Sequence, residues 1–128
     1  MDVMNFFQRR RILKQVNFLD LRPVRMIEHE VREEGLVNVL LPRFKNRVAS
    51  ALFQPGRKDP VIRIKLDRFG GQTWLLIDGV SKVSQICEKL AEAFPEELTV
   101  AEENIDRVTK FLSLLYRERY ITFREIQD

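Results

Sequence analysis

Alternating apolar and polar positions predict β-strands in the first half of the chain. Residues 26–32 place Ile27, His29 and Val31 on one face and two glutamates on the other. Residues 36–41 repeat the apolar pattern, and a Glu-Glu-Gly turn joins the two runs. This arrangement predicts an antiparallel hairpin that Pro42 ends.

A third strand is predicted at residues 61–66, where Ile62, Ile64 and Leu66 alternate with more polar positions. The connection before it, residues 43–60, is long enough to be functional or mobile. A short amphipathic turn is predicted inside this connection, and it carries Phe44, Val48, Leu52 and Phe53.

The pattern then changes to a helical period. Asp67 is a suitable N-cap for a first helix that ends near Gly79. A second helix ends at Pro95, with Val83, Ile86, Cys87, Leu90 and Phe94 on its apolar face. A third helix opens with a capping-box pattern, Thr99-Val100-Ala101-Glu102, and its expected apolar face holds Ile105, Val108, Phe111, Leu112 and Leu115.

Residues 120–126 alternate again and predict a closing strand. Strands, three helices and a last strand predict an α+β fold, a winged helix-turn-helix with a small antiparallel sheet plus three helices. We expect one domain over residues 21–128 and an N-terminal extension over residues 1–20. The extension has loose helical spacing, so it is expected to pack on the domain or within a homodimer; attachment to a membrane surface is the alternative.

Composition places the chain among globular proteins. Of its 128 residues, 45% are hydrophobic and 32% are charged. One cysteine, Cys87, excludes an internal disulfide and fits a reducing compartment. No apolar run approaches the roughly 20 residues of a membrane span. Phe6 and Phe7 precede the first basic residues, unlike a signal peptide. We therefore expect a cytoplasmic protein.

The net charge of +3 is unevenly distributed. Residues 43–68 carry eight basic and two acidic side chains, whereas residues 69–128 carry seven basic and eleven acidic ones. The basic stretch could attract nucleic acid, lipid headgroups or an acidic protein, or it could be a solvated loop. Because the helical half is acidic, a DNA-binding winged-helix regulator is kept only as the alternative function.

No constellation for catalysis is present in the sequence. His29 is the single histidine and lies on an apolar strand face, and Cys87 lies on an apolar helix face. Gly70-Gly71 lacks the other residues of a phosphate-binding loop, so Gly71 is expected to allow close packing instead. The glutamates near residue 100 suit the N-terminus of a helix. We expect no enzyme activity, metal or cofactor.

Residues 61–121 resemble the PqqD family, whose pattern is a strand ending in Leu-Asn/Asp, a helix ending in Leu-Asp-Gly, and two further helices. The matching positions are Ile64-Lys65-Leu66-Asp67, Gly71, Trp74, Leu76-Ile77-Asp78-Gly79, Val83, Ile86, Leu90, Phe94, Val108, Phe111-Leu112, Leu115 and Tyr120-Ile121. Three positions depart from the pattern. Lys82 replaces a capping Thr, so Ser81 is expected to cap instead; Gln85 replaces Glu; and Arg119 replaces a helix-ending Gly.

The resemblance implies a non-catalytic adaptor, a recognition element for ribosomally made peptides. Such proteins bind the leader of a precursor peptide and present it to a radical S-adenosylmethionine maturase, in the namesake for pyrroloquinoline quinone biosynthesis. The leader is implied to add beside the third strand and to enter a groove against the last helix. The implied peptide-binding residues are Val61, Arg63 and Lys65 on the strand, and Asn104, Val108, Lys110 and Phe111 on outward positions of the helix. For Val108 and Phe111 a position in the core is the alternative, and it is the commoner one for apolar residues at this spacing.

Overall fold

The computed structural model describes residues 17–42 and 61–126. The chain divides into two compact units, one of residues 27–71 and one of residues 1–26 together with 72–128. Three α-helices and two antiparallel sheets in the described residues make the fold α+β, as predicted. The N-terminal extension expected over residues 1–20 lies outside the described part up to residue 16, and the amphipathic turn predicted at 43–60 lies entirely outside it.

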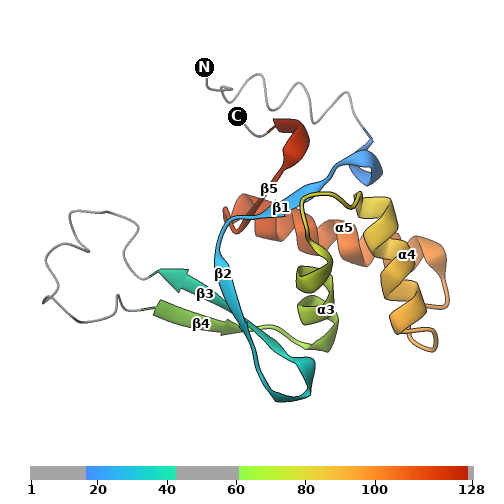
Figure 1. Cartoon of the computed structure of the whole chain (residues 1–128). Coiled ribbons are helices and arrows are strands. Elements are labelled where there is room, and N and C mark those ends of the chain that lie inside the picture. The colour runs from blue at the N-terminus through green and yellow to red at the C-terminus, as the bar shows by residue number, and fades with distance from the viewer. Residues whose placement is uncertain (1–16, 43–60, 127–128) are drawn as a thin grey trace, which may run out of the picture. The chain divides into compact units, whose positions relative to one another are not determined.

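The unit of residues 27–71 is built on a three-stranded antiparallel sheet. Its strands are β2 (Glu28–Val31), β3 (Val37–Pro42) and β4 (Val61–Lys65), in the order β2-β3-β4 (Figure 1). The predicted hairpin is confirmed as the β2–β3 pair. Its turn takes left-handed backbone angles at Glu34 and Gly35, which brings the chain directly back along β2.

Helix α3 (Arg68–Leu76) follows β4 after a short connection. The predicted cap is confirmed, since Asp67 Oδ1 accepts a 2.7 Å hydrogen bond from the Gly70 N–H. A Cβ on Gly71 would lie 3.3 Å from Val37 Cγ2 and 3.4 Å from the Val37 backbone nitrogen. The absence of a side chain at Gly71 therefore lets the helix backbone approach β3, as expected from the sequence.

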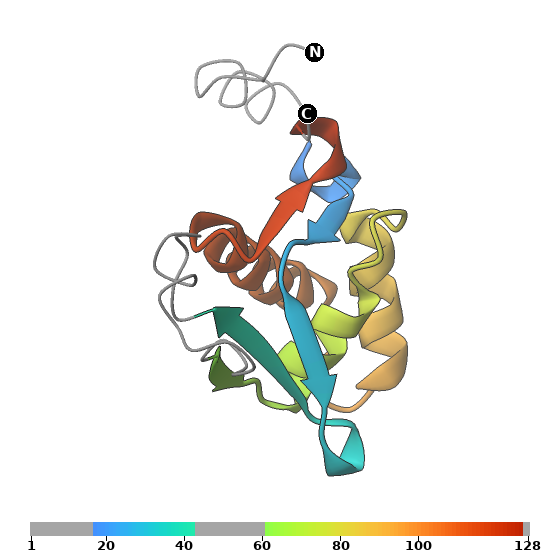
Figure 2. The ribbon, with the colours of Figure 1, turned by 60° about the vertical axis from the view of Figure 1, so that its left-hand side comes forward.

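The other unit contains a second sheet that the sequence pattern did not predict. Strand β1 (Pro23–Arg25) pairs with β5 (Ile121–Phe123) in antiparallel register (Figure 2). The pattern had predicted a strand over 120–126, but residues 124–126 form a 3₁₀ turn. Gly79, at φ +79°, donates its N–H to the Pro23 carbonyl at 3.0 Å. The α3–α4 connection thus runs along β1.

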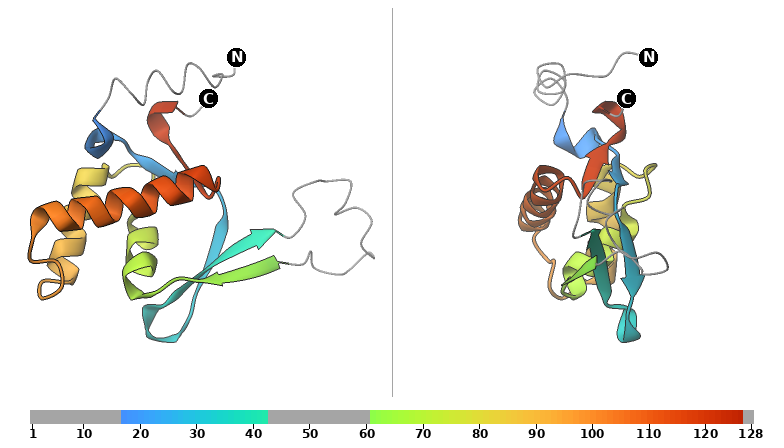
Figure 3. Two further views of the ribbon diagram at one scale, coloured as in Figure 1. Left: turned by 180° about the vertical axis from the view of Figure 1, so that it is seen from behind. Right: turned by 90° about the vertical axis from the view of Figure 1, so that its left-hand side faces the viewer.

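Helices α4 (Val83–Ala93) and α5 (Ala101–Arg117) contact one another in this unit (Figure 3). The predicted apolar face of α4 is buried. The buried face of α5 is narrower than predicted and consists of Asn104, Val108, Leu112 and Leu115. Ile105 and Phe111 are only partly buried. The difference arises because a few degrees of helix rotation change which flanking positions reach the core.

Two of the predicted helix caps are wrong. Helix α5 begins after Val100, and no side chain caps it. Helix α4 begins after Lys82, whose N–H donates to Gln85 Oε1 at 2.8 Å. Ser81 lies one residue before this N-cap position, and its hydroxyl and N–H both donate to the Asp78 carboxylate instead. Backbone hydrogen bonds from Ser81 and Val80 lower the pKa of Asp78.

Arg119 takes the left-handed conformation, at φ +67°, as its position predicts. The Tyr120 N–H donates to the Leu115 carbonyl at 2.9 Å, and the Arg119 N–H donates to the Tyr116 carbonyl at 3.0 Å. These two bonds form a Schellman motif, which closes the C-terminus of α5 and normally contains glycine at the left-handed position.

We expect Arg119→Gly to stabilise the protein by about 0.5–1 kcal/mol. The left-handed conformation costs a residue with a Cβ about 1–2 kcal/mol, and glycine's greater freedom in the unfolded chain offsets part of the gain. Urea unfolding would measure the change. Arg117→Gly, two residues earlier inside α5, is the matched control and should destabilise by about 1 kcal/mol. Destabilisation of similar size by both would contradict the strain at Arg119.

Candidate functional site

Strand β4 is an edge strand of its sheet. It pairs with β3 through the register Asn38↔Lys65 to Pro42↔Val61. Across the described residues, no strand pairs with its other side. An edge strand of this kind presents backbone N–H and C=O groups that another chain can pair with.

The hydrogen-bond phase identifies which residues of β4 face outward. The Leu66 N–H donates to the Val37 carbonyl at 2.9 Å, so these two residues form a hydrogen-bonded pair. Hydrogen-bonded and non-hydrogen-bonded pairs alternate along an antiparallel ladder. The backbone groups of Ile62 and Ile64 therefore point toward β3, and those of Val61, Arg63 and Lys65 point away from it. We call these outward groups of Val61, Arg63 and Lys65 the open edge.

Pro42 fits the same phase. It lies opposite Val61, at a non-hydrogen-bonded pair. A proline has no N–H to donate, and at this position none is needed for pairing with β4. The Arg32 N–H donates to the Leu36 carbonyl on the β2 side, which sets the complementary phase there. Both sides of β3 thus give one consistent ladder.

Side chains along the open edge are accessible. Val61 is 37% exposed, and Arg63 and Lys65 are also exposed. Val61, Arg63 and Lys65 project from one face of the sheet because their side chains alternate with those of Ile62 and Ile64. The structure therefore brings together the three strand residues that the sequence had selected.

Arg63 is not a free cation. Its Nε donates to Glu30 Oε1 at 2.8 Å, and Asn38 Nδ2 donates to the same oxygen at 3.0 Å. The hydrogen bond from Asn38, followed by that from Arg63, lowers the pKa of Glu30. In the described part of the structure Lys65 has no ion-pair partner. Lys65 is therefore the cation of the open edge that remains available.

The sequence pattern did not indicate a role for Glu30 or Asn38. Glu30 lies opposite Asn38 on β2 and β3, and Asn38 lies opposite Lys65 on β4. Their connection to Arg63 depends on the registers of two strand pairs. The alternation did indicate that Glu30 projects from the polar face of its strand, but alternation alone does not show which residue of another strand it meets.

The predicted helix residues divide into two groups. Asn104 is 3% exposed, so the expectation that it points outward is wrong, and Val108 is 0% exposed, which confirms its place on the apolar face of the helix. Both lie on the face of α5 that continues to Leu112, and Asn104 Nδ2 donates to the Cys87 carbonyl at 2.9 Å. Lys110 is exposed and pairs with Asp106 at 2.9 Å, while Phe111 is half-buried.

Cys87 and His29 were weighed above as a nucleophile and a metal ligand. Cys87 is buried, and burial raises the pKa of its thiol. His29 is half-buried on β2. Within residues 17–42 and 61–126, no three or more His, Cys, Asp or Glu side chains are grouped to hold a metal. No helix in these same ranges is long and apolar enough to cross a membrane.

Comparison with known proteins adds one match to this geometry. The family model for coenzyme PQQ synthesis protein D (PqqD) matches residues 58–121, which is half of the chain and includes β4 and all of α3, α4 and α5. No curated protein and no solved structure matches significantly. Because this family model covers half of the chain, the chain belongs to the PqqD family.

Proposed function

We propose that this protein is a non-catalytic adaptor that binds the leader segment of a ribosomally made precursor peptide. The leader adds as a further strand along the open edge, and the adaptor presents the peptide to a radical S-adenosylmethionine maturase. Membership of the PqqD family supports this role. The observation that carries it is the open edge of β4, with three residues whose backbone groups are directed away from β3.

Strand addition divides affinity and selectivity between two kinds of contact. Backbone hydrogen bonds to Val61, Arg63 and Lys65 would supply affinity for any extended peptide. Side chains would supply selectivity, and Lys65 favours an acidic residue beside it. Arg63 contributes less to this preference because Glu30 already neutralises it. We expect the leader to be extended and to carry an acidic residue opposite the end of β4.

Amide hydrogen exchange in the full chain tests this proposal. The probes are synthetic peptides that cover the short reading frames beside the gene. A leader that adds as a strand should slow exchange at Val61, Arg63 and Lys65. It should change exchange little at Ile62 and Ile64, whose N–H groups are directed to β3 in the free protein. The alternating pattern is the expected result because the ladder alternates.

Two outcomes would contradict strand addition. One is a uniform change along β4, which would indicate binding through side chains or a change in the whole unit. The other is unchanged amide exchange with every leader peptide, together with slowed exchange of the same amides when a DNA duplex is added at low salt. That result would favour the DNA-binding alternative. Lys110→Ala and Phe111→Ala, measured with the same peptides, test the predicted contribution of α5 separately.

A further inference from the structure

A second concave site lies in the unit that contains α4 and α5. It is a pocket of about 390 Å³, and its walls come from Leu19, from α4 and from the start of α5. The apolar part of the lining is contributed by Leu19, Cys87, Ala91, Leu98, Ala101 and Ile105. None of these residues belongs to the open edge, so this pocket needs an explanation of its own.

Asn104 gives this pocket a specific polar requirement. Its side chain is one of the lining residues and is only 3% exposed. Its Nδ2 donates to the Cys87 carbonyl, and a carbonyl only accepts, so the orientation of the amide is determined. The remaining atom, Oδ1, is buried and has no hydrogen-bond partner among the described residues. A buried acceptor without a partner calls for a donor.

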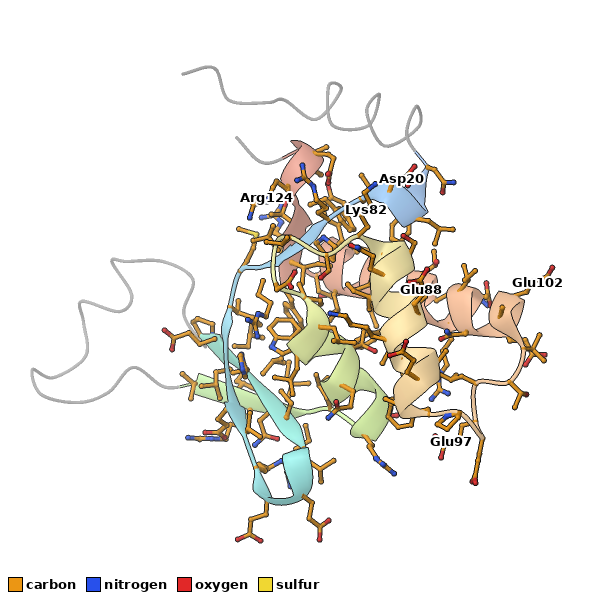
Figure 4. All side chains as sticks on the ribbon, turned by 45° about the vertical axis from the view of Figure 1, so that its right-hand side comes forward. Asp20, Lys82, Glu88, Glu97, Glu102 and Arg124 are labelled. Atoms are coloured by element: carbon orange, nitrogen blue, oxygen red, sulfur yellow. The ribbon has the colours of Figure 1, made fainter. Side chains whose placement is uncertain are left out.

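The charges around the pocket specify the kind of donor. Glu88 is the one acidic residue among those that line it. Glu88, Glu97 and Glu102 come from α4, from the α4–α5 connection and from the first turn of α5 (Figure 4). Residues 84–105 contain six glutamates and one lysine, a net charge of −5. A cationic side chain that only donates, carried between apolar neighbours, matches this lining.

The chain itself carries such a segment. Residues 1–16 contain four basic residues and one acidic residue, a net charge of +3. Arg9, Arg10 and Arg11 stand between Phe6-Phe7 and Ile12-Leu13. Arg11 is eight residues from Leu19, a wall of the pocket, and eight residues can span up to about 26–29 Å.

We propose that the N-terminal segment of the same chain docks on the α4–α5 pocket, with an arginine donating to Asn104 Oδ1 and Glu88 and the flanking apolar side chains covering Leu19 and Ile105. The segment then has a defined position on a surface other than the open edge. Two other occupants are conceivable: the N-terminal segment of a second copy in a homodimer, or a similar basic segment of a partner protein.

Photo-cross-linking of the full chain tests the proposal. Phe7 is replaced by p-benzoylphenylalanine, and the cross-linked peptides are identified by mass spectrometry after irradiation. The expected product is a cross-link within one chain to residues 84–105. The matched control carries the same group in place of Phe44, whose segment has no assigned role at this pocket. It should not label residues 84–105.

Two further variants separate docking from chance proximity. Replacing Arg9, Arg10 and Arg11 by Ser, or Glu88 by Lys, should reduce the cross-link yield to roughly a tenth, as expected when a mostly docked segment becomes mostly undocked. Replacing Arg47, Arg57 and Lys58 by Ser removes the same charge and should leave the yield unchanged. Cross-links that join two chains, cross-links outside the pocket, or a yield that Glu88→Lys does not change would each overturn the proposal.

Discussion

Arg63→Pro should reduce leader-peptide affinity at least tenfold while leaving the protein folded. The Arg63 N–H is directed away from β3, so its loss removes no bond of the native sheet. An added strand, however, would lose one backbone hydrogen bond and would meet the proline ring at the centre of the open edge. A loss of about 1.4 kcal/mol in binding free energy corresponds to a factor of ten.

Arg63→Ala is the matched control for this experiment. Both substitutions remove the guanidinium and its bond to Glu30 Oε1, and that oxygen then keeps the hydrogen bond from Asn38 Nδ2. Only the proline removes the outward N–H. Titration calorimetry with the leader peptide should show a small change for alanine and a large one for proline. Equal affinities for the two variants would mean that the leader does not pair with the backbone of β4.

Ile64→Pro, one residue further along, should have the opposite consequence. The N–H of Ile64 is directed to β3, opposite Val39, because Leu66 and Val37 two positions away form a hydrogen-bonded pair. Proline there removes a native ladder bond and leaves the Val39 carbonyl without its donor. Val39 is fully buried, so we expect a loss of about 3 kcal/mol or more in the free energy of unfolding.

Ile64→Ala provides the comparison, since it removes the side chain but keeps the N–H. Chemical denaturation should show alanine to be less damaging than proline by about 1–3 kcal/mol, the cost of an unsatisfied buried group. If Arg63→Pro destabilised the protein as much as Ile64→Pro, the assigned phase of the ladder would be wrong. The open edge would then consist of the even-numbered residues instead.

Most helices and strands could be predicted from the sequence because they depend on local chemistry. Alternation located β2, β3 and β4, and a 3.6-residue period located α4 and α5. Asp67 marked the start of α3, and Gly71 indicated a close approach of backbone and neighbour. Each of these depends on one side chain or on spacing within a short window. Such local patterns predict the folded structure correctly when tertiary contacts do not oppose them.

Helix ends and helix faces were harder to predict from the sequence. The pattern at Thr99 predicted a capping box, but α5 begins after Val100. Asn104 was assigned to an outward position in the groove that the family resemblance implies, and it is instead buried with one hydrogen bond to the Cys87 carbonyl. A polar residue can occupy a buried position when a partner on another helix accepts its donor, and no pattern within α5 indicates that partner.

By itself, the sequence predicted strands β2, β3 and β4 and the three helices in their order, and it carried the family resemblance from which Val61, Arg63 and Lys65 were chosen. The tertiary structure alone decided that β1 pairs with β5, that Glu30 holds Arg63, and that the odd-numbered residues of β4 face outward. The reason is physical. Periodicity reports which side of an element is buried, whereas pairing, register and hydrogen-bond phase join residues that are distant in the sequence.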